Sequence, residues 1–129
     1  QHSFEVTQVN EMLTGMESFP GLFIASTNLR EGLDAASLRR FDLKVRFDYL
    51  RPDQAWKLFC RYCEALHLPT PNSVIEYRLA RLSMLAPGDF AMAMRQTRFR
   101  NVTAAEHLLE ILEAECALKE GSKNAIGFV

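Results

Sequence analysis

The chain has 129 residues, of which 48% are hydrophobic and 24% are charged, and its formal net charge is -1. This composition predicts a folded protein with one core, or with one core and part of another. The nearly neutral charge gives no general attraction to nucleic acid or to an anionic membrane. No apolar run approaches the roughly 18 residues of a membrane span. The odd number of cysteines, 3, predicts reduced thiols and a cytoplasmic protein.

Residues 1–50 predict helices around two short strands. A helix is expected from about Phe4 to Glu17, because apolar residues recur there every three or four positions: Val6, Val9, Leu13 and Met16. The apolar run Leu22–Ala25 predicts a strand buried on both faces, as in a parallel sheet. In Leu43–Phe47 apolar and polar residues alternate, which predicts an edge strand with one apolar face.

Polar residues lie between these two strands. Ser26, Thr27 and Asn28 follow the first strand at its carboxyl end, where ligands bind in open α/β sheets. Asp34 is expected to cap a short helix over 35–38, which would place the pair Arg39-Arg40 just beyond its end.

Residues 51–129 predict four helices on short loops. The first follows Arg51-Pro52-Asp53, the second is capped by Ser73, and the third opens after Pro87-Gly88 and runs to about Phe99. A capping box, Thr103 to Glu106, opens the fourth, which ends near Lys119 and Gly121. The expected core positions are Trp56, Phe59, Cys63 and Leu66, then Ile75, Leu79 and Leu82, then Leu108, Leu109, Leu112 and Cys116.

The order of these motifs resembles the AAA ATPase family. The runs FIASTN, LDAASLRRFD and EVTQVNEMLTGME are similar to the second half of its nucleotide-binding domain, and LAPGDF and the terminal IGF also recur in bacterial members. The sequence has no Gly-x-x-x-x-Gly-Lys-Ser/Thr phosphate loop and no apolar strand ending in Asp-Glu. We therefore interpret the chain as a fragment of a longer ATPase. The expected fold class is an α/β remnant with two parallel-type strands, residues 1–50, followed by an all-α four-helix lid domain, residues 51–129.

The resemblance implies roles for particular residues. Asn28 corresponds to the first sensor, an amide that hydrogen-bonds the γ-phosphate or orients the attacking water; a plain turn residue is the alternative. Arg40 corresponds to the arginine finger with Arg39 as its helper, although both could be solvated charges at a helix end. In the resembled family Gly88 and Asp89 would stand where the lid meets the nucleotide, although an aspartate at this position is more often simply a helix cap.

The resemblance also implies partners. The full-length protein is expected to bind ATP and Mg²⁺, to form a homo-oligomeric ring, and to remodel a protein client, whereas this fragment alone should hold no nucleotide tightly and should be inactive. A stand-alone helical interaction module without nucleotide chemistry is the alternative.

Two weaker patterns have ordinary structural explanations. The pair Cys60 and Cys63 has the spacing of half a zinc site but lies mid-helix, and the arginines at 95–100 are best explained as a solvated helix end.

The two strands predicted in residues 1–50 also bear on association. In the resembled fold another strand separates these two. They would therefore either pair directly or keep open edges that favour self-association of residues 1–50.

Overall fold

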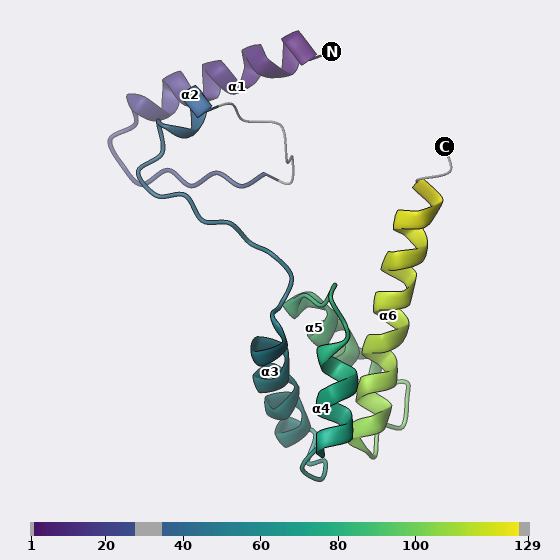
Figure 1. The fold of residues 1–129 in the computed structure, drawn as a ribbon. Helices are drawn as coiled ribbons and strands as arrows, with labels where there is room; N and C mark the ends of the chain where they lie inside the picture. Colours follow the sequence, from purple (N-terminus) through teal and green to yellow (C-terminus); the bar gives the residue numbers. More distant parts are fainter. Residues whose placement is uncertain (1, 28–34, 127–129) are drawn as a thin grey trace. The chain divides into compact units, whose positions relative to one another are not determined.

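The computed structural model describes residues 2–27 and 35–126 (Figure 1). The chain divides into two compact units, residues 1–46, here called the first unit, and residues 47–129, here called the helical unit. No helix in the described ranges is long and apolar enough to cross a membrane. The first unit contains α1, His2–Glu17, and α2, Ala35–Leu38, and the helical unit contains α3, Pro52–Ala65, α4, Ser73–Ala80, α5, Pro87–Gln96, and α6, Ala105–Ile126.

The described residues contain no β-strand, so the predicted α/β class with two parallel strands is wrong. Leu22–Ala25 and Leu43–Phe47 have no regular secondary structure, and no backbone hydrogen bond joins them. Apolar side chains in both segments face solvent: Leu22 is 84% exposed and Phe47 is 92% exposed. An apolar alternation becomes a strand only when a neighbouring strand supplies partners for its N–H and C=O groups, and two short strands alone are marginal.

The first unit is built on α1, which confirms the helix expected over 4–17. Leu13 is fully buried. The helix stops after Glu17, where the Ser18 hydroxyl donates to the carbonyl of Gly15 at 3.0 Å and the Phe19 amide donates to Met16 at 3.1 Å. These bonds occupy carbonyls that the end of the helix would otherwise leave unpaired.

Both ends of α3 are stabilised by local hydrogen bonds. Pro52 opens the helix, and the Gln54 side chain accepts a hydrogen bond from the Arg51 amide at 3.0 Å. At the other end His67 adopts a positive φ of 56°, and the Leu68 amide donates to Cys63 at 2.9 Å. This is a Schellman ending with histidine where glycine is usual.

Two predicted helix signals differ from the structure. Asn72 caps α4 in place of Ser73, since its side chain accepts from the Ile75 amide at 3.1 Å. The expected capping box at the start of α6 is also replaced, because the Thr103 amide donates to Nδ1 of His107 at 3.2 Å. At the start of both helices, the capping side chain is the one that lies within reach of an unpaired backbone amide, and residue type alone does not identify it.

The predicted end of α6 near Gly121 is wrong as well. The helix continues to Ile126, and its last turns extend beyond the other helices of the unit (Figure 1). Gly121 has no positive φ, and a Cβ built there would meet no atom within 4 Å. Glycine inside a helix costs only about 1 kcal/mol relative to alanine, so it does not by itself end one.

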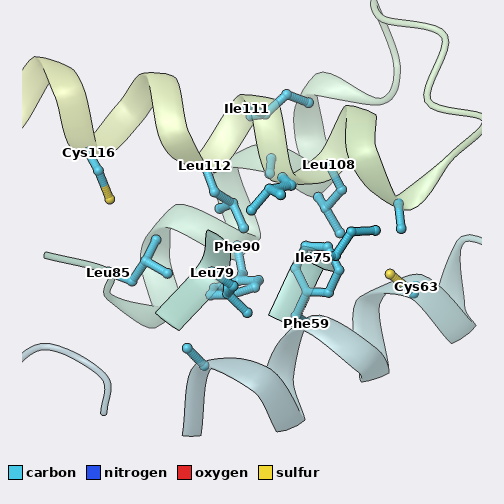
Figure 2. Packing of buried hydrophobic residues seen from close by; sticks show 14 residues of the cluster. Phe59, Cys63, Ile75, Leu79, Leu85, Phe90, Leu108, Ile111, Leu112 and Cys116 are labelled. Carbon is cyan, nitrogen blue, oxygen red and sulfur yellow. The ribbon is translucent and has the colours of Figure 1, made fainter. Parts of the chain in front are cut away.

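All four helices of the helical unit contribute to one core, which confirms most of the expected apolar positions. Phe59 of α3, Phe90 of α5 and Leu112 of α6 are fully buried and converge with α4 residues between them (Figure 2). The ring of Phe90 also packs on Tyr62, with centroids 5.5 Å apart. The buried cluster comprises Ala55, Phe59, Cys63, Ile75, Leu79, Leu85, Phe90, Ala93, Ala105, Leu108, Leu109, Ile111, Leu112 and Cys116. The expected positions Trp56 and Leu82 are only partly buried against it.

Candidate functional site

The arginine pair lies directly after α2, as the sequence predicts. The amides of Arg39 and Arg40 donate to the carbonyls of Ala35 and Ser37, both at 3.2 Å, so the two residues continue the last turn. Lys44 Nζ donates to the carbonyl of Leu38 at 3.2 Å and to the carbonyl of Phe41, just after the arginine pair, at 3.1 Å. The ammonium therefore neutralises the negative end of this short helix while both arginines remain exposed.

Arg40 also contacts the end of α1. Its Nε lies 3.2 Å from Oε1 of Glu17, and the side chains are 37% and 53% exposed. An ion pair with this much solvent access stabilises by only about 0–1 kcal/mol. The guanidinium is thus positioned by Glu17, yet little free energy opposes its transfer to another anion.

Asn28, the expected sensor, lies outside the described residues, as does Asp34, the expected cap of α2. Thr27 is the last described residue before that gap, and it is exposed. The proximity of Asn28 to the arginine pair therefore stays a prediction.

Gly88 and Asp89 lie in the first turn of α5 but have different surroundings. Gly88 is exposed, and a Cβ there would meet no atom within 4 Å. Asp89 is only 7% exposed. One of its carboxylate oxygens, Oδ2, accepts from the Ala86 amide at 2.8 Å and from Lys119 Nζ at 2.5 Å. The carboxylate therefore caps α5 from inside the helix, and its contact with a nucleotide stays a prediction.

Lys119 connects four parts of the helical unit. Besides Asp89, its ammonium donates to the carbonyl of Met84 at 2.8 Å and lies 5.6 Å from the centre of the Tyr49 ring. Next to Tyr49, the Leu50 amide donates to Leu85 at 2.7 Å. The start of the unit, the loop before α5, the first turn of α5 and the middle of α6 are thus held at one charged group. The sequence indicated Lys119 only as a charge near a helix end, because its partners lie far away in the chain.

A groove between α3 and α4 was not anticipated from the sequence. It encloses about 320 Å³, and we call it the α3–α4 groove. Its lining residues are Pro52, Asp53, Trp56, Lys57, Glu76 and Ala80. The sequence placed Trp56 in the core, but its ring is only partly buried and stacks on Phe59 with centroids 6.3 Å apart. The indole thus forms a wall that the core holds in place.

The cysteines are free thiols in the helical unit. Burial raises the pKa of Cys63 to about 11, and burial likewise raises the pKa of Cys60 and of Cys116. These thiols are therefore poor nucleophiles at neutral pH. No group of three or more metal-ligating side chains occurs in residues 2–27 and 35–126.

Comparisons of the chain with protein-family models, with curated proteins and with solved structures found no match.

Proposed function

We propose that this chain is the C-terminal part of an AAA ATPase and that it supplies Arg40 as an arginine finger and residues 51–129 as a helical lid. The parent protein would be a cytoplasmic homo-oligomeric ring that hydrolyses ATP with Mg²⁺ and remodels a protein client. The observation that carries the proposal is the run LDAASLRRFD combined with its local structure. Residues 35–38 form a helix, and Arg39 and Arg40 leave its end exposed.

The chemistry of Arg40 supports this role. A guanidinium is planar and permanently charged, and its donors match two phosphate oxygens at once. Among the described residues, Arg40 contacts the carboxylate of Glu17 in a solvent-exposed pair. A γ-phosphate carries more negative charge and accepts charge-assisted hydrogen bonds, so exchanging Glu17 for a phosphate on a ring neighbour is favourable. Arg39 would assist, and Asn28 would orient the attacking water.

The helical unit supports the second part of the proposal. Its four helices share one core, and Lys119 fixes the residues that enter the unit to α5 and α6. A unit held in this way moves as one body, which is what coupling nucleotide binding to a client requires. Gly88, exposed in the first turn of α5, leaves room for a nucleotide to approach the backbone.

The test uses the full-length parent. Replacing Arg40 with Ala should lower kcat by roughly 10³- to 10⁵-fold and leave ATP affinity nearly unchanged, because an arginine finger acts on a neighbour's transition state. Mixing this variant with subunits that lack the phosphate-loop lysine should restore part of the turnover at mixed interfaces. Arg81→Ala is the control, since Arg81 is an exposed arginine of the helical unit outside the proposed site. A large loss of ATP affinity in the Arg40 variant, without rescue on mixing, would refute the role in trans.

A protein-interaction module without nucleotide chemistry is the second candidate, and the α3–α4 groove favours it. Reading the coding sequence upstream of Gln1 separates the two. A phosphate loop and a strand ending in two acidic residues should precede this chain if it belongs to an ATPase, and both should be missing if it is a stand-alone module. For the chain by itself, we expect no ATPase activity under the first proposal, because it lacks the groups that hold the phosphates and Mg²⁺.

A further inference from the structure

The end of α5 and the turn after it present three arginines and one phenylalanine to solvent. We call residues 95–100 the basic turn. Arg95, Arg98 and Arg100 are exposed, and Phe99 is 88% exposed. None of the three arginines forms an ion pair or a side-chain hydrogen bond with another residue in the described part of the chain. The guanidinium groups and the ring are therefore available to an external ligand.

Backbone hydrogen bonds hold these side chains on a fixed turn. The amides of Phe99 and Arg100 both donate to the carbonyl of Gln96 at 2.9 Å. The Arg98 amide donates to the carbonyl of Arg95 at 3.3 Å. A ligand that binds here does not have to order the backbone, which is one of the costs that weaken binding to flexible loops.

The sequence favoured a solvated helix end for these arginines, but that explanation omits two features. The attraction between a cation and the C-terminal end of a helix is limited to the last turn and does not involve an aromatic ring. Phe99 forgoes the stabilisation that burial of its ring would give. Arg95 and Arg98 lie three residues apart, a spacing at which like charges on a helix repel each other. Both features become favourable when a flat, anionic ligand covers the turn.

The charge around the basic turn is positive although the net charge of the chain is -1. Between residues 90 and 105 the sequence contains the three arginines and no Asp or Glu. Asp89, at the other end of α5, is paired with Lys119. Glu106 and Glu110, in the first two turns of α6, form no ion pair with the basic turn. Salt screens exposed charges that are more than about 10 Å apart, so more distant carboxylates have little effect here.

A pocket adjoins the basic turn at Arg100. It encloses about 180 Å³, and its lining residues are Arg100, Asn101, Val102, His107, Glu110 and Ile111. The side chains of Asn101 and Glu110 have no hydrogen-bond or ion-pair partner among residues 2–27 and 35–126. A carboxylate accepts a hydrogen bond from the exocyclic amino group of cytosine, and an amide both donates and accepts. The pocket therefore offers contacts for the edge of a base beside a ring on which another base can stack.

We propose that the basic turn and this pocket bind a single-stranded nucleic acid. The three arginines contact phosphates, Phe99 stacks on one base, and Glu110 accepts from the amino group of a neighbouring base. Aromatic side chains and cationic groups combine in this way in proteins that bind single strands, whereas the bases of a duplex are already stacked on each other. An acidic protein segment would pair with the arginines but would leave Phe99 without a flat partner. The inference goes beyond the proposed ATPase function and does not depend on it.

Fluorescence anisotropy of the whole chain with labelled single strands provides the test. The probes are homopolymers of deoxycytidine and of thymidine, about 12 nucleotides long, which is within the range of known single-strand sites. We expect binding at about 50 mM salt, with a slope of log affinity against log salt near -2, because three phosphate contacts contribute about 0.7 each. The cytosine strand should bind more tightly than the thymine strand, and a duplex of equal length should bind more weakly than both. RNA strands of the same bases identify which sugar is preferred, and tighter binding of either kind supports the proposal.

Variants separate stacking, charge and base recognition. Phe99→Ala should weaken binding of single strands by roughly 5- to 150-fold without changing the salt slope, because it removes one stacked base. Arg98→Ala should reduce the magnitude of the slope by about 0.7. Glu110→Ala should abolish the preference for cytosine while raising the affinity for the thymine strand. The matched controls Tyr77→Ala and Arg81→Ala, an exposed aromatic residue and an exposed arginine outside the basic turn, should bind normally. Circular dichroism checks that each variant folds.

Several outcomes would overturn the proposal. One is the absence of single-strand binding at low salt, and another is a loss of affinity in Phe99→Ala no larger than in Tyr77→Ala. A poly-glutamate peptide that displaces the cytosine strand at equal concentration would assign the turn to an acidic protein segment instead. An unchanged preference for cytosine in Glu110→Ala would remove the pocket from the site. Arg40→Ala should bind single strands normally, so failure of the arginine finger and failure of this proposal are distinguishable.

Discussion

Replacing Asp89 with Ala should destabilise the helical unit by about 3 kcal/mol. The side chains of Asp89 and Lys119 are 9% and 24% exposed, so water screens their attraction poorly. Breaking such a pair by removing one partner costs roughly 3–5 kcal/mol when burial is complete, and the remaining access of Lys119 to solvent places this site at the lower end. The substitution also removes the acceptor for the Ala86 amide, which is 2.8 Å from Oδ2.

Two further variants separate the ion pair from the cap. Asp89→Asn keeps an oxygen for the Ala86 amide and loses the charge, so it should cost less than Asp89→Ala. The double variant Asp89→Ala/Lys119→Met removes the unpaired ammonium as well. We expect it to cost about 1–2 kcal/mol, close to the loss of a helix cap, and therefore less than the single substitution.

Urea unfolding followed by Trp56 fluorescence and by circular dichroism measures these differences at neutral pH. Hydrogen exchange at the Leu50 amide provides a local measurement, because that amide donates to Leu85 beside the Lys119 network. Exchange should accelerate in Asp89→Ala. The pair does not hold the unit together if Asp89→Ala lowers the free energy of unfolding by less than about 1 kcal/mol. The same conclusion follows if the double variant costs as much as Asp89→Ala and Lys119→Met added together.

Two more predictions concern the helical unit. His67→Gly should stabilise it by about 1 kcal/mol in chemical denaturation, because His67 has a φ of 56° and only glycine adopts this region without strain. His67→Ala is the control, because alanine keeps a Cβ at this φ. An unchanged denaturation midpoint in His67→Gly would contradict the prediction. Because burial raises the pKa of Cys63 from 9.0 to about 11, its contribution to stability should be complete below about pH 9 and should decline as the pH rises towards 11. The urea midpoint should fall over this range in the wild type and fall less in Cys63→Ala, and equal slopes would rule the thiol out.

Local sequence patterns were enough to predict the four helices within residues 51–129 and most of their buried faces. Leu108, Leu109, Leu112 and Cys116 recur with helical spacing and are all buried. Pro52 likewise marks the start of α3, since a proline at the first helical position needs no amide partner. Periodicity and helix-start signals act within a few residues, so no distant contact is needed to read them. The arginine pair after α2 was predicted for the same reason.

The remaining features depend on contacts between segments that are distant in the sequence. Leu43–Phe47 has the alternation of a strand but forms none, because a strand depends on hydrogen bonds from another segment and the described chain provides none there. Asp89 was predicted at the start of α5, yet its pairing with Lys119 depends on α6 folding back beside it. The α3–α4 groove likewise exists only once the two helices pack. Local spacing fixes which residues share a helix face, whereas burial, charge pairing and concavity depend on residues that are distant in the sequence.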